Sequence, residues 1–250
     1  MIASPTDHYG EGGEWRSPTI LTRHVDRQPD DLGYSRFASG IVLMLAEHAT
    51  LKRILHDRPP MPARVPDGYE RDAVTLLLVD RAETRALLIQ KADNQGYRWR
   101  AHVALPGGRI DANDDDASAA ALRELHEELG VSQDAVEVFG TMGHFQTWHS
   151  KNDLEVIVGR WTDPTSVCVD PREVSQFFEV PLSQLMALHV ERGFRGEAAD
   201  AIGEALVYPV EGVNIWGVTA RILHAFLELA AGHHVLPAYP ASPRHPFRCC

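Results

Sequence analysis

The chain has 250 residues, of which 24 are lysine or arginine and 35 are aspartate or glutamate, so its formal net charge is −11. A protein that holds nucleic acid by bulk charge needs a basic surface, and this acidic balance argues against that class. With 44% hydrophobic and 24% charged residues, the composition is typical of a globular protein. We expect one domain of about 150–200 residues with extensions, or a single large domain.

The cysteines and the first residues bear on where the protein resides. Three cysteines are too few for a disulfide scaffold, and two of them close the sequence, as expected in a reducing compartment. No basic segment followed by an apolar run begins the chain, so no signal peptide is predicted. The longest apolar run, residues 41–46, is far shorter than the roughly 20 residues that span a bilayer. We therefore expect a cytoplasmic protein that does not bind membranes, with a homodimer as the default oligomer.

The two ends of the chain differ from its middle. Residues 1–33 are rich in Gly, Pro, Asp and Arg without a hydrophobic period, whereas apolar residues over 34–56 recur at steps near three and four, which indicates a helix. Prolines at positions 59, 60 and 62 end that helix. We expect an N-terminal extension over 1–68, with one helix and a Pro-rich linker, and a main domain over 69–232. Prolines at every third position from 237 to 246 favour an extended Pro-rich tail over 233–250.

The main domain begins with short apolar runs that are typical of strands. Residues 74–79 and 86–90 are apolar and partly β-branched, and the charged segment between them predicts a hairpin. Residues 117–129 predict a helix, with Asp116 or Ser118 as its N-cap and Gly130 as the glycine that ends it.

The second half of the main domain continues this mixture of strands and helices. A strand edge followed by a helix is expected over 174–188, a long helix over 215–231, and further strands over 136–139, 143–145, 154–161 and 206–209. Because strands and helices do not alternate in a regular βαβ repeat, the sequence predicts an α+β fold in which helices sandwich a mixed sheet.

The helix over 117–129 carries an unusual set of acids. Glu124, Glu127 and Glu128 are spaced by three and four residues, which places them on one face of the helix. Adjacent carboxylates repel each other, and a hard divalent cation such as Mg²⁺ or Mn²⁺, which prefers oxygen ligands, would compensate. Arg123, four residues before Glu127, can orient that carboxylate through a charged hydrogen bond.

A solvent-exposed charged helix is the competing interpretation of these acids. Several neighbouring features favour a site instead. Gly107 and Gly108 precede the helix and permit a close backbone approach to a ligand. Seven acidic but only two basic side chains lie between Gly107 and Gly130. The net negative charge of the chain is thus concentrated where a metal site is predicted.

The segment from Gly107 to Val131 resembles the Nudix box. Its second half is complete as Arg-Glu-Leu-His-Glu-Glu-Leu-Gly-Val from Arg123. Its longer first half, with aspartates at 111 and 114, resembles the coenzyme A pyrophosphatase branch of that superfamily. Residues 171–174, 178–182 and 215–223 are also similar to that branch, so the resemblance covers about residues 70–230.

The substrate signature of the branch is only partly present. Upstream of the glycines, the usual Thr, Arg and Ser are replaced by Ile89, Lys91 and Ala92. The segment with metal ligands is thus intact, whereas the segment linked to substrate choice has diverged. Hydrolysis of a diphosphate is therefore a stronger expectation than coenzyme A as the substrate.

The resemblance implies a Nudix fold and hydrolysis, with Mg²⁺ or Mn²⁺, of a nucleoside diphosphate linked to another group. Our hypothesis for the metal ligands is the Gly108 carbonyl with Glu124, Glu127 and Glu128, of which Glu128 is the strongest. A box glutamate, or Glu173 from a later loop, would take the proton of the attacking water. The expected residues are therefore, for catalysis, Glu124, Glu127, Arg123 and Glu173, and, for substrate binding, Lys91, Arg98 and Arg100.

Several functions remain open at this point. The leading hypothesis is a pyrophosphatase acting on coenzyme A or its thioesters, and the nearest alternative is one acting on ADP-ribose or a dinucleotide. A non-catalytic Nudix-like sensor that regulates a partner through residues 1–68 is a second class, although a pure sensor need not keep three glutamates. An interaction protein that uses the proline tail is a third class, supported by that tail alone.

Overall fold

The computed structural model describes residues 48–57, 65–92, 102–147, 150–164 and 167–231. Most of the predicted N-terminal extension, the proline tail and the two candidate arginines Arg98 and Arg100 lie outside these residues. Within the described residues, no helix is both long enough and apolar enough to cross a bilayer.

A seven-stranded mixed sheet forms the centre of the fold, with strands in the order β3-β2-β1-β6-β5. β1 pairs in parallel with β6 and antiparallel with β2, and β7 adds to β2 on its other side. The strands are β1 Glu70–Asp80, β2 Thr84–Lys91, β3 Val103–Ala104, β4 Gly107–Arg109, β5 Val136–Gln146, β6 Asn152–Trp161 and β7 Val174–Pro181.

The sheet divides between β1 and β2, and this division positions the site. Residues 77–80 of β1 pair with β2, but residues 72–74 pair with β4 instead. The end of β2 pairs with β3, and the Thr75 amide donates to the carbonyl of Pro106 (2.8 Å). The short segment from β3 to β4 therefore crosses the opening between the two strands.

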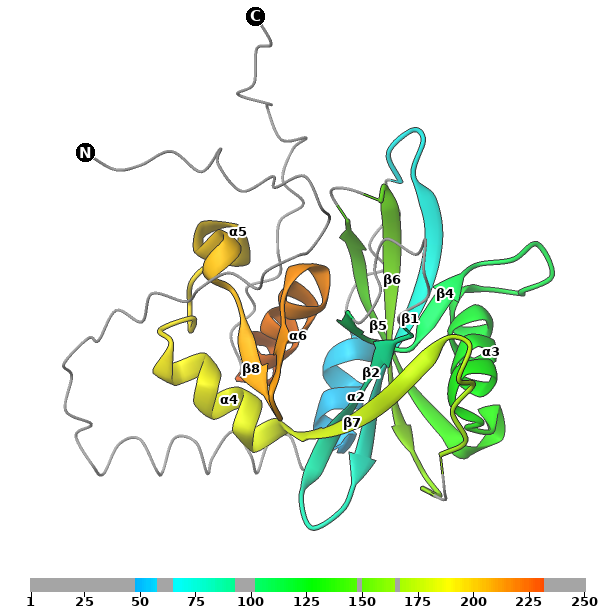
Figure 1. The fold of residues 1–250 in the computed structure, drawn as a ribbon, viewed down its shortest axis with the longest axis horizontal. Coiled ribbons are helices and arrows are strands. Elements are labelled where there is room, and N and C mark those ends of the chain that lie inside the picture. The colour runs from blue at the N-terminus through cyan, green and yellow to red at the C-terminus, as the bar shows by residue number, and fades with distance from the viewer. Residues whose placement is uncertain (1–47, 58–64, 93–101, 148–149, 165–166, 232–250) are drawn as a thin grey trace, which may run out of the picture.

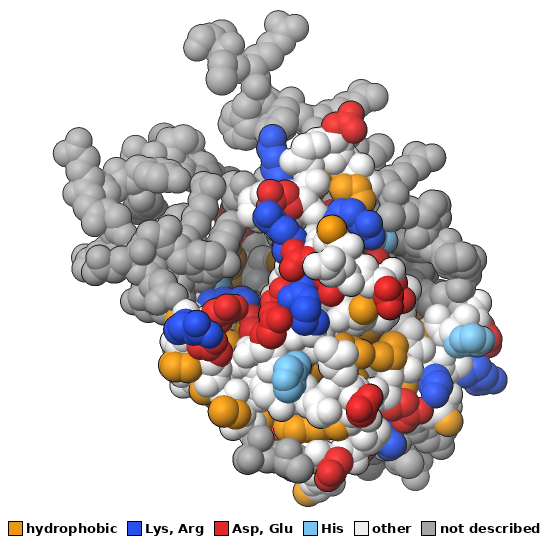
Figure 2. All heavy atoms as spheres, turned by 90° about the vertical axis from the view of Figure 1, so that its right-hand side faces the viewer, with side chains coloured by type: hydrophobic (Ala, Val, Ile, Leu, Met, Phe, Trp, Pro, Cys, Tyr) orange, Lys and Arg blue, Asp and Glu red, His pale blue; other side chains and the backbone are white. Residues whose placement is uncertain are grey.

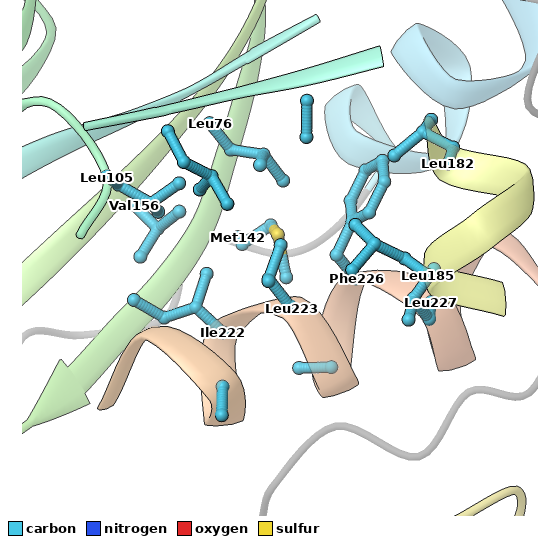
Figure 3. Close-up of a cluster of buried hydrophobic side chains, with 14 of the residues drawn as sticks. Leu76, Leu105, Met142, Val156, Leu182, Leu185, Ile222, Leu223, Phe226 and Leu227 are labelled. Atoms are coloured by element: carbon cyan, nitrogen blue, oxygen red, sulfur yellow. The ribbon is translucent and has the colours of Figure 1, made fainter. Parts of the chain in front are cut away.

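Helices cover both faces of the sheet (Figure 1). α3 (Ala117–Leu129) packs on one face, where its leucines meet β1 and β2. α2 (His48–His56), α4 (Leu182–Glu191) and α6 (Gly217–Ala230) contribute to the larger core on the other face. Figure 3 shows this core, in which Ile222, Leu223 and Phe226 of α6 lie between the sheet and α4. The predicted α+β class, with a mixed sheet between helices, is confirmed.

Most predicted elements are present, with some differences. The hairpin and the helix over 117–129 are confirmed. The two strands expected over 136–139 and 143–145 form one strand, β5, whose register against β6 shifts at two positions. The strand and helix expected over 174–188 are β7 and α4, and the remaining small elements are α5 (Ala199–Ile202), β8 (Tyr208–Val210), β9 (Val213–Ile215) and the 3₁₀ turns Gln133–Ala135 and Gly203–Ala205.

A polar network is buried in the core beside α4 and α6. The two ring nitrogens of His189 lie 2.8 Å from the Tyr208 hydroxyl and 2.8 Å from the Glu228 carboxylate. The other Glu228 oxygen accepts from the Gly196 amide at 3.1 Å. Burial lowers the pKa of His189 and of its neighbour His224. Each histidine therefore binds a proton less readily in the folded state than in the unfolded chain.

This difference predicts a loss of stability in acid. As the pH falls through about 6.5, the unfolded histidines take up protons first, and the free energy of unfolding drops by up to about 1.4 kcal/mol per pH unit for each proton. We expect His189→Gln to reduce the pH dependence of the free energy of unfolding between pH 7.5 and 5.5, measured by urea unfolding. The same slope in both proteins would contradict the assignment.

Candidate functional site

Both ends of α3 are fixed, so the direction of its acidic face is set. The Asp116 side chain accepts a hydrogen bond from the Ala119 amide (2.8 Å) at the N-terminus. Gly130 ends the helix in the left-handed conformation (φ 70°), which a glycine adopts without strain. Leu125 and Leu129 are fully buried against the sheet. The glutamates at positions 124 and 128 consequently face the segment that crosses the opening in the sheet.

The two glycines of that segment lie against β1 and α3. A Cβ atom on Gly107, whose φ is +144°, would lie 2.3 Å from the carbonyl oxygen of Ala73. A Cβ atom on Gly108 would lie 2.6 Å from the carboxyl carbon of Glu124. Only glycine leaves room for backbone and carboxylate to approach this closely. The glycine pair thus brings main-chain groups directly beneath the acidic face of the helix.

Glu128 is the most buried acid of the site, with 1% of its surface exposed. One carboxylate oxygen accepts from the Gly107 amide (2.9 Å), and the other contacts the ammonium of Lys91. Burial raises the pKa of the Glu128 carboxyl, while Lys91 and the Gly107 amide oppose that rise. A buried carboxylate needs such partners to remain charged. The net effect of this environment is a raised pKa for Glu128, and Lys91 and the Gly107 amide keep that rise smaller.

Arg123 orders the acids around it. Its guanidinium donates two parallel hydrogen bonds to the Asp114 carboxylate (both 3.0 Å) and one to the carbonyl of Arg109 (3.0 Å). It also donates to Glu124 (2.9 Å) and to Glu127 (3.1 Å), so the predicted contact with Glu127 is confirmed. A bidentate pair fixes both groups in one plane. Arg123 is therefore anchored by the loop before α3 and in turn positions two glutamates.

The three glutamates differ in exposure. Glu124 is half-buried, and burial raises the pKa of its carboxyl despite the opposing effect of Arg123. Glu124 and Glu128 also repel each other, which raises the pKa of Glu128 further. Glu127 is more exposed, and its carboxylate accepts a hydrogen bond from Arg123. Two of the three predicted carboxylates, those of Glu124 and Glu128, thus lie against the glycine pair, and that of Glu127 is more exposed.

Two further predicted residues lie at the end of β2. The Lys91 ammonium lies 3.5 Å from the Gly107 carbonyl in addition to its contact with Glu128. The Glu173 carbonyl accepts from the amide of Ala92 (2.8 Å), so Glu173 is beside Lys91 in the fold, and its side chain is exposed. The structure brings these two residues to the same edge as the glycine pair, although they are 82 positions apart in sequence.

Two acids near the site were not predicted to act there. Asp114 pairs with Arg123, whose hydrogen bonds lower the pKa of that carboxyl. Asp72 accepts from the Asn152 amide group (2.6 Å), and burial raises the pKa of its carboxyl. Asp114 stands at the second aspartate position of the loop that precedes the helix, which was a usable signal. Asp72 has no such signal, because only the pairing of β1 with β4 and β6 brings it here.

The chemistry of the donors fits a hard divalent cation. Carboxylate oxygens from Glu124 and Glu128 lie at the backbone of Gly107 and Gly108, and oxygen donors of this type are what Mg²⁺ and Mn²⁺ prefer. The side chains of the described residues contain no group of three or more His, Cys, Asp or Glu that is already arranged around one metal position. Figure 2, which faces the α3 side, shows acidic and basic side chains intermixed across this surface.

Comparisons with known proteins identify the family of the domain. The family model described as the NUDIX domain matches residues 70–200. The chain is 31% identical to an uncharacterized Nudix hydrolase, NudL, of Photorhabdus laumondii, over 66% of this chain and 88% of that protein. It is 30% identical to the NudL protein of Shigella flexneri over 71% of this chain and 90% of that protein.

Among solved structures, an Ap4A hydrolase of C. elegans matches 47% of this chain and 84% of its own, with 18% identity and a TM-score of 0.39. The assignment is based on the domain match and the sequence relatives, and not on this weaker likeness. By these two criteria, the chain belongs to the Nudix family of hydrolases.

Proposed function

We propose that this protein hydrolyses the diphosphate bond of a nucleoside diphosphate derivative with the help of Mg²⁺ or Mn²⁺, and that coenzyme A or one of its thioesters is the leading substrate. One observation carries the proposal: the carboxylates of Glu124 and Glu128 lie against the glycine pair. Two cations contact these carboxylates, Lys91 at Glu128 and Arg123 at Glu124. A diphosphate carries several negative charges, and a site that cleaves it must both neutralise them and align a water molecule.

The residues divide into groups with distinct roles in this proposal. The carbonyl of Gly108 with Glu124, Glu127 and Glu128 would hold the divalent ions, which when bound polarise the phosphoryl oxygens and lower the pKa of a bound water. Arg123 positions Glu124 and Glu127 through its hydrogen bonds. Hydrolysis adds water across one P–O bond, giving two phosphate products.

The remaining roles concern the water and the phosphates. A box glutamate, or Glu173 directly before β7, would accept the proton that the water loses. Lys91 would donate to a phosphate oxygen, since its ammonium already lies among the oxygens of Glu128 and Gly107. Arg98 and Arg100 are proposed as further phosphate contacts from the sequence alone.

A hydrolysis panel tests the proposal. The full chain is incubated with Mg²⁺ or Mn²⁺ and coenzyme A, an acyl-coenzyme A, ADP-ribose, NADH or a dinucleoside polyphosphate, and products are identified by mass. We expect turnover that a chelator abolishes, with 3′,5′-ADP formed from coenzyme A. Turnover of only ADP-ribose or a dinucleotide would reassign the substrate. No turnover of any compound would contradict the proposal and favour a ligand sensor.

A further inference from the structure

Trp216 is an exposed aromatic residue at the N-cap position of α6. Among the described residues, only Phe177 (39%) and Trp216 (45%) are large hydrophobic side chains with so much exposed surface. The two differ in their surroundings. Trp216 packs edge-on against the ring of His102, with ring centroids 4.4 Å apart and an interplanar angle of 62°. Phe177 lies in the outer strand β7, and none of the described ring contacts includes it.

The aromatic pair is held firmly by the fold on both sides. Ile215, directly before the tryptophan, is fully buried in the core. Three residues after Trp216, the buried hydroxyl of Thr219 donates to the carbonyl of Val103 in β3 (3.2 Å). Since His102 directly precedes Val103, this hydrogen bond links the backbones that carry both rings. The fold therefore holds together the two backbone segments from which the rings extend.

The backbone of His102 is hydrogen-bonded to that of Lys91, a residue of the proposed phosphate site. The Lys91 amide donates to the carbonyl of His102 (2.9 Å), which continues the register in which Gln90 is opposite Val103. Directly opposite residues on antiparallel strands project to the same face, with Cβ atoms about 5 Å apart. His102 consequently extends from the sheet beside Lys91, whose ammonium contacts Glu128. Burial lowers the pKa of His102, which favours the neutral form of its ring.

We infer that Trp216, supported by His102, is the surface on which the nucleobase of the substrate stacks. This inference depends on the proposed function for the position of the diphosphate, which would lie at Lys91 and the glycine pair. A half-exposed aromatic ring that packs against His102, the residue opposite the proposed phosphate-binding Lys91, fits a ligand in which a flat base is joined to phosphates. Stacking on tryptophan tolerates different bases, so this subsite selects a nucleotide without selecting one base strongly.

Binding of two small probes tests the inference without catalysis. AMP and ribose 5-phosphate carry the same phosphate and sugar, but only AMP has a base. We expect the full chain to bind AMP about tenfold more tightly than ribose 5-phosphate in calorimetric titrations, a difference within the range that one stacked base supplies. Trp216→Leu should remove this difference, and Trp216→Phe should restore much of it. Phe177→Leu, the matched control, should keep the wild-type difference.

The outcomes separate this inference from the proposed function. If a folded Trp216→Leu protein, judged by an unchanged melting temperature, still prefers AMP about tenfold, the stacking role is wrong. Equal or absent binding of both probes to the wild-type chain also overturns it. If the preference depends on Trp216 but the hydrolysis panel shows no turnover, the base subsite stands and the proposed catalysis fails.

Discussion

Replacing Glu128 by glutamine is expected to reduce metal-dependent hydrolysis by at least ~100-fold, because a metal ion at a phosphoryl oxygen contributes several kcal/mol to the transition state and each 1.36 kcal/mol is a factor of ten. Glutamine keeps the size of the side chain and an oxygen that can accept from the Gly107 amide, but it removes the charge. The measurement is kcat/KM on whichever compound of the panel turns over, together with Mn²⁺ binding by calorimetry.

A second glutamate serves as the control. Glu191 is exposed at the end of α4, which packs on the face of the sheet opposite α3 (Figure 1). Glu191→Gln should keep both turnover and Mn²⁺ affinity close to wild type. If Glu128→Gln retains full turnover with Mg²⁺, the metal role of Glu128 is wrong. If the variant loses turnover but binds Mn²⁺ normally, Glu128 acts on the reaction without holding the metal.

Replacing Gly107 by alanine is expected to lower the free energy of unfolding by about 3 kcal/mol. The added Cβ atom would lie 2.3 Å from the Ala73 carbonyl oxygen and 2.6 Å from the Cα of Val74. Both are backbone atoms of a central strand, so neither can move aside without disturbing the sheet. β4 would then separate from β1, and the Gly107 amide would lose its hydrogen bond to Glu128. We therefore expect both stability and turnover to fall, measured by urea unfolding and by kcat.

Gly193 offers a matched comparison for this strain. Its φ is also positive (+70°), but a Cβ atom there would meet no atom within 4 Å. Gly193→Ala consequently carries only the cost of a left-handed alanine, about 1 kcal/mol. Equal losses of stability in the two variants would show that crowding at Gly107 is unimportant.

The sequence predicted the elements with long, regular patterns and failed where pairing decides the structure. The helix over 117–129 has apolar residues at helical spacing and residues that cap both ends, so its limits were predictable. β3 and β4 have two and three residues and are too short to show a period. β4 forms because residues 72–74 of β1 pair with it and not with β2, and β3 forms because residues 89–90 of β2 pair with it. The two register shifts of β5 likewise follow from its partner β6 and cannot be recognised in the strand alone.

The same distinction applies to the candidate site. The spacing of Glu124, Glu127 and Arg123 is local, so their proximity and the contact between Arg123 and Glu127 were predictable. The contact between Lys91 and Glu128 joins residues 37 positions apart and depends on the division of the sheet. That Glu128 is nearly buried while Glu127 is exposed was also not predictable, because it depends on how closely the glycine pair approaches the helix.

The parallel pairing of β1 with β6 joins residues about 80 positions apart, since Glu70 lies opposite Asn152. Contacts between distant segments require closure of a long loop before any pairing energy is gained, which slows folding. α3 lies within that loop, and the glycine strand β4 hydrogen-bonds to β1. The acidic helix and the glycine strand are thus enclosed by a long-range pairing, so recovery of turnover during refolding would follow formation of the sheet rather than of the acidic helix.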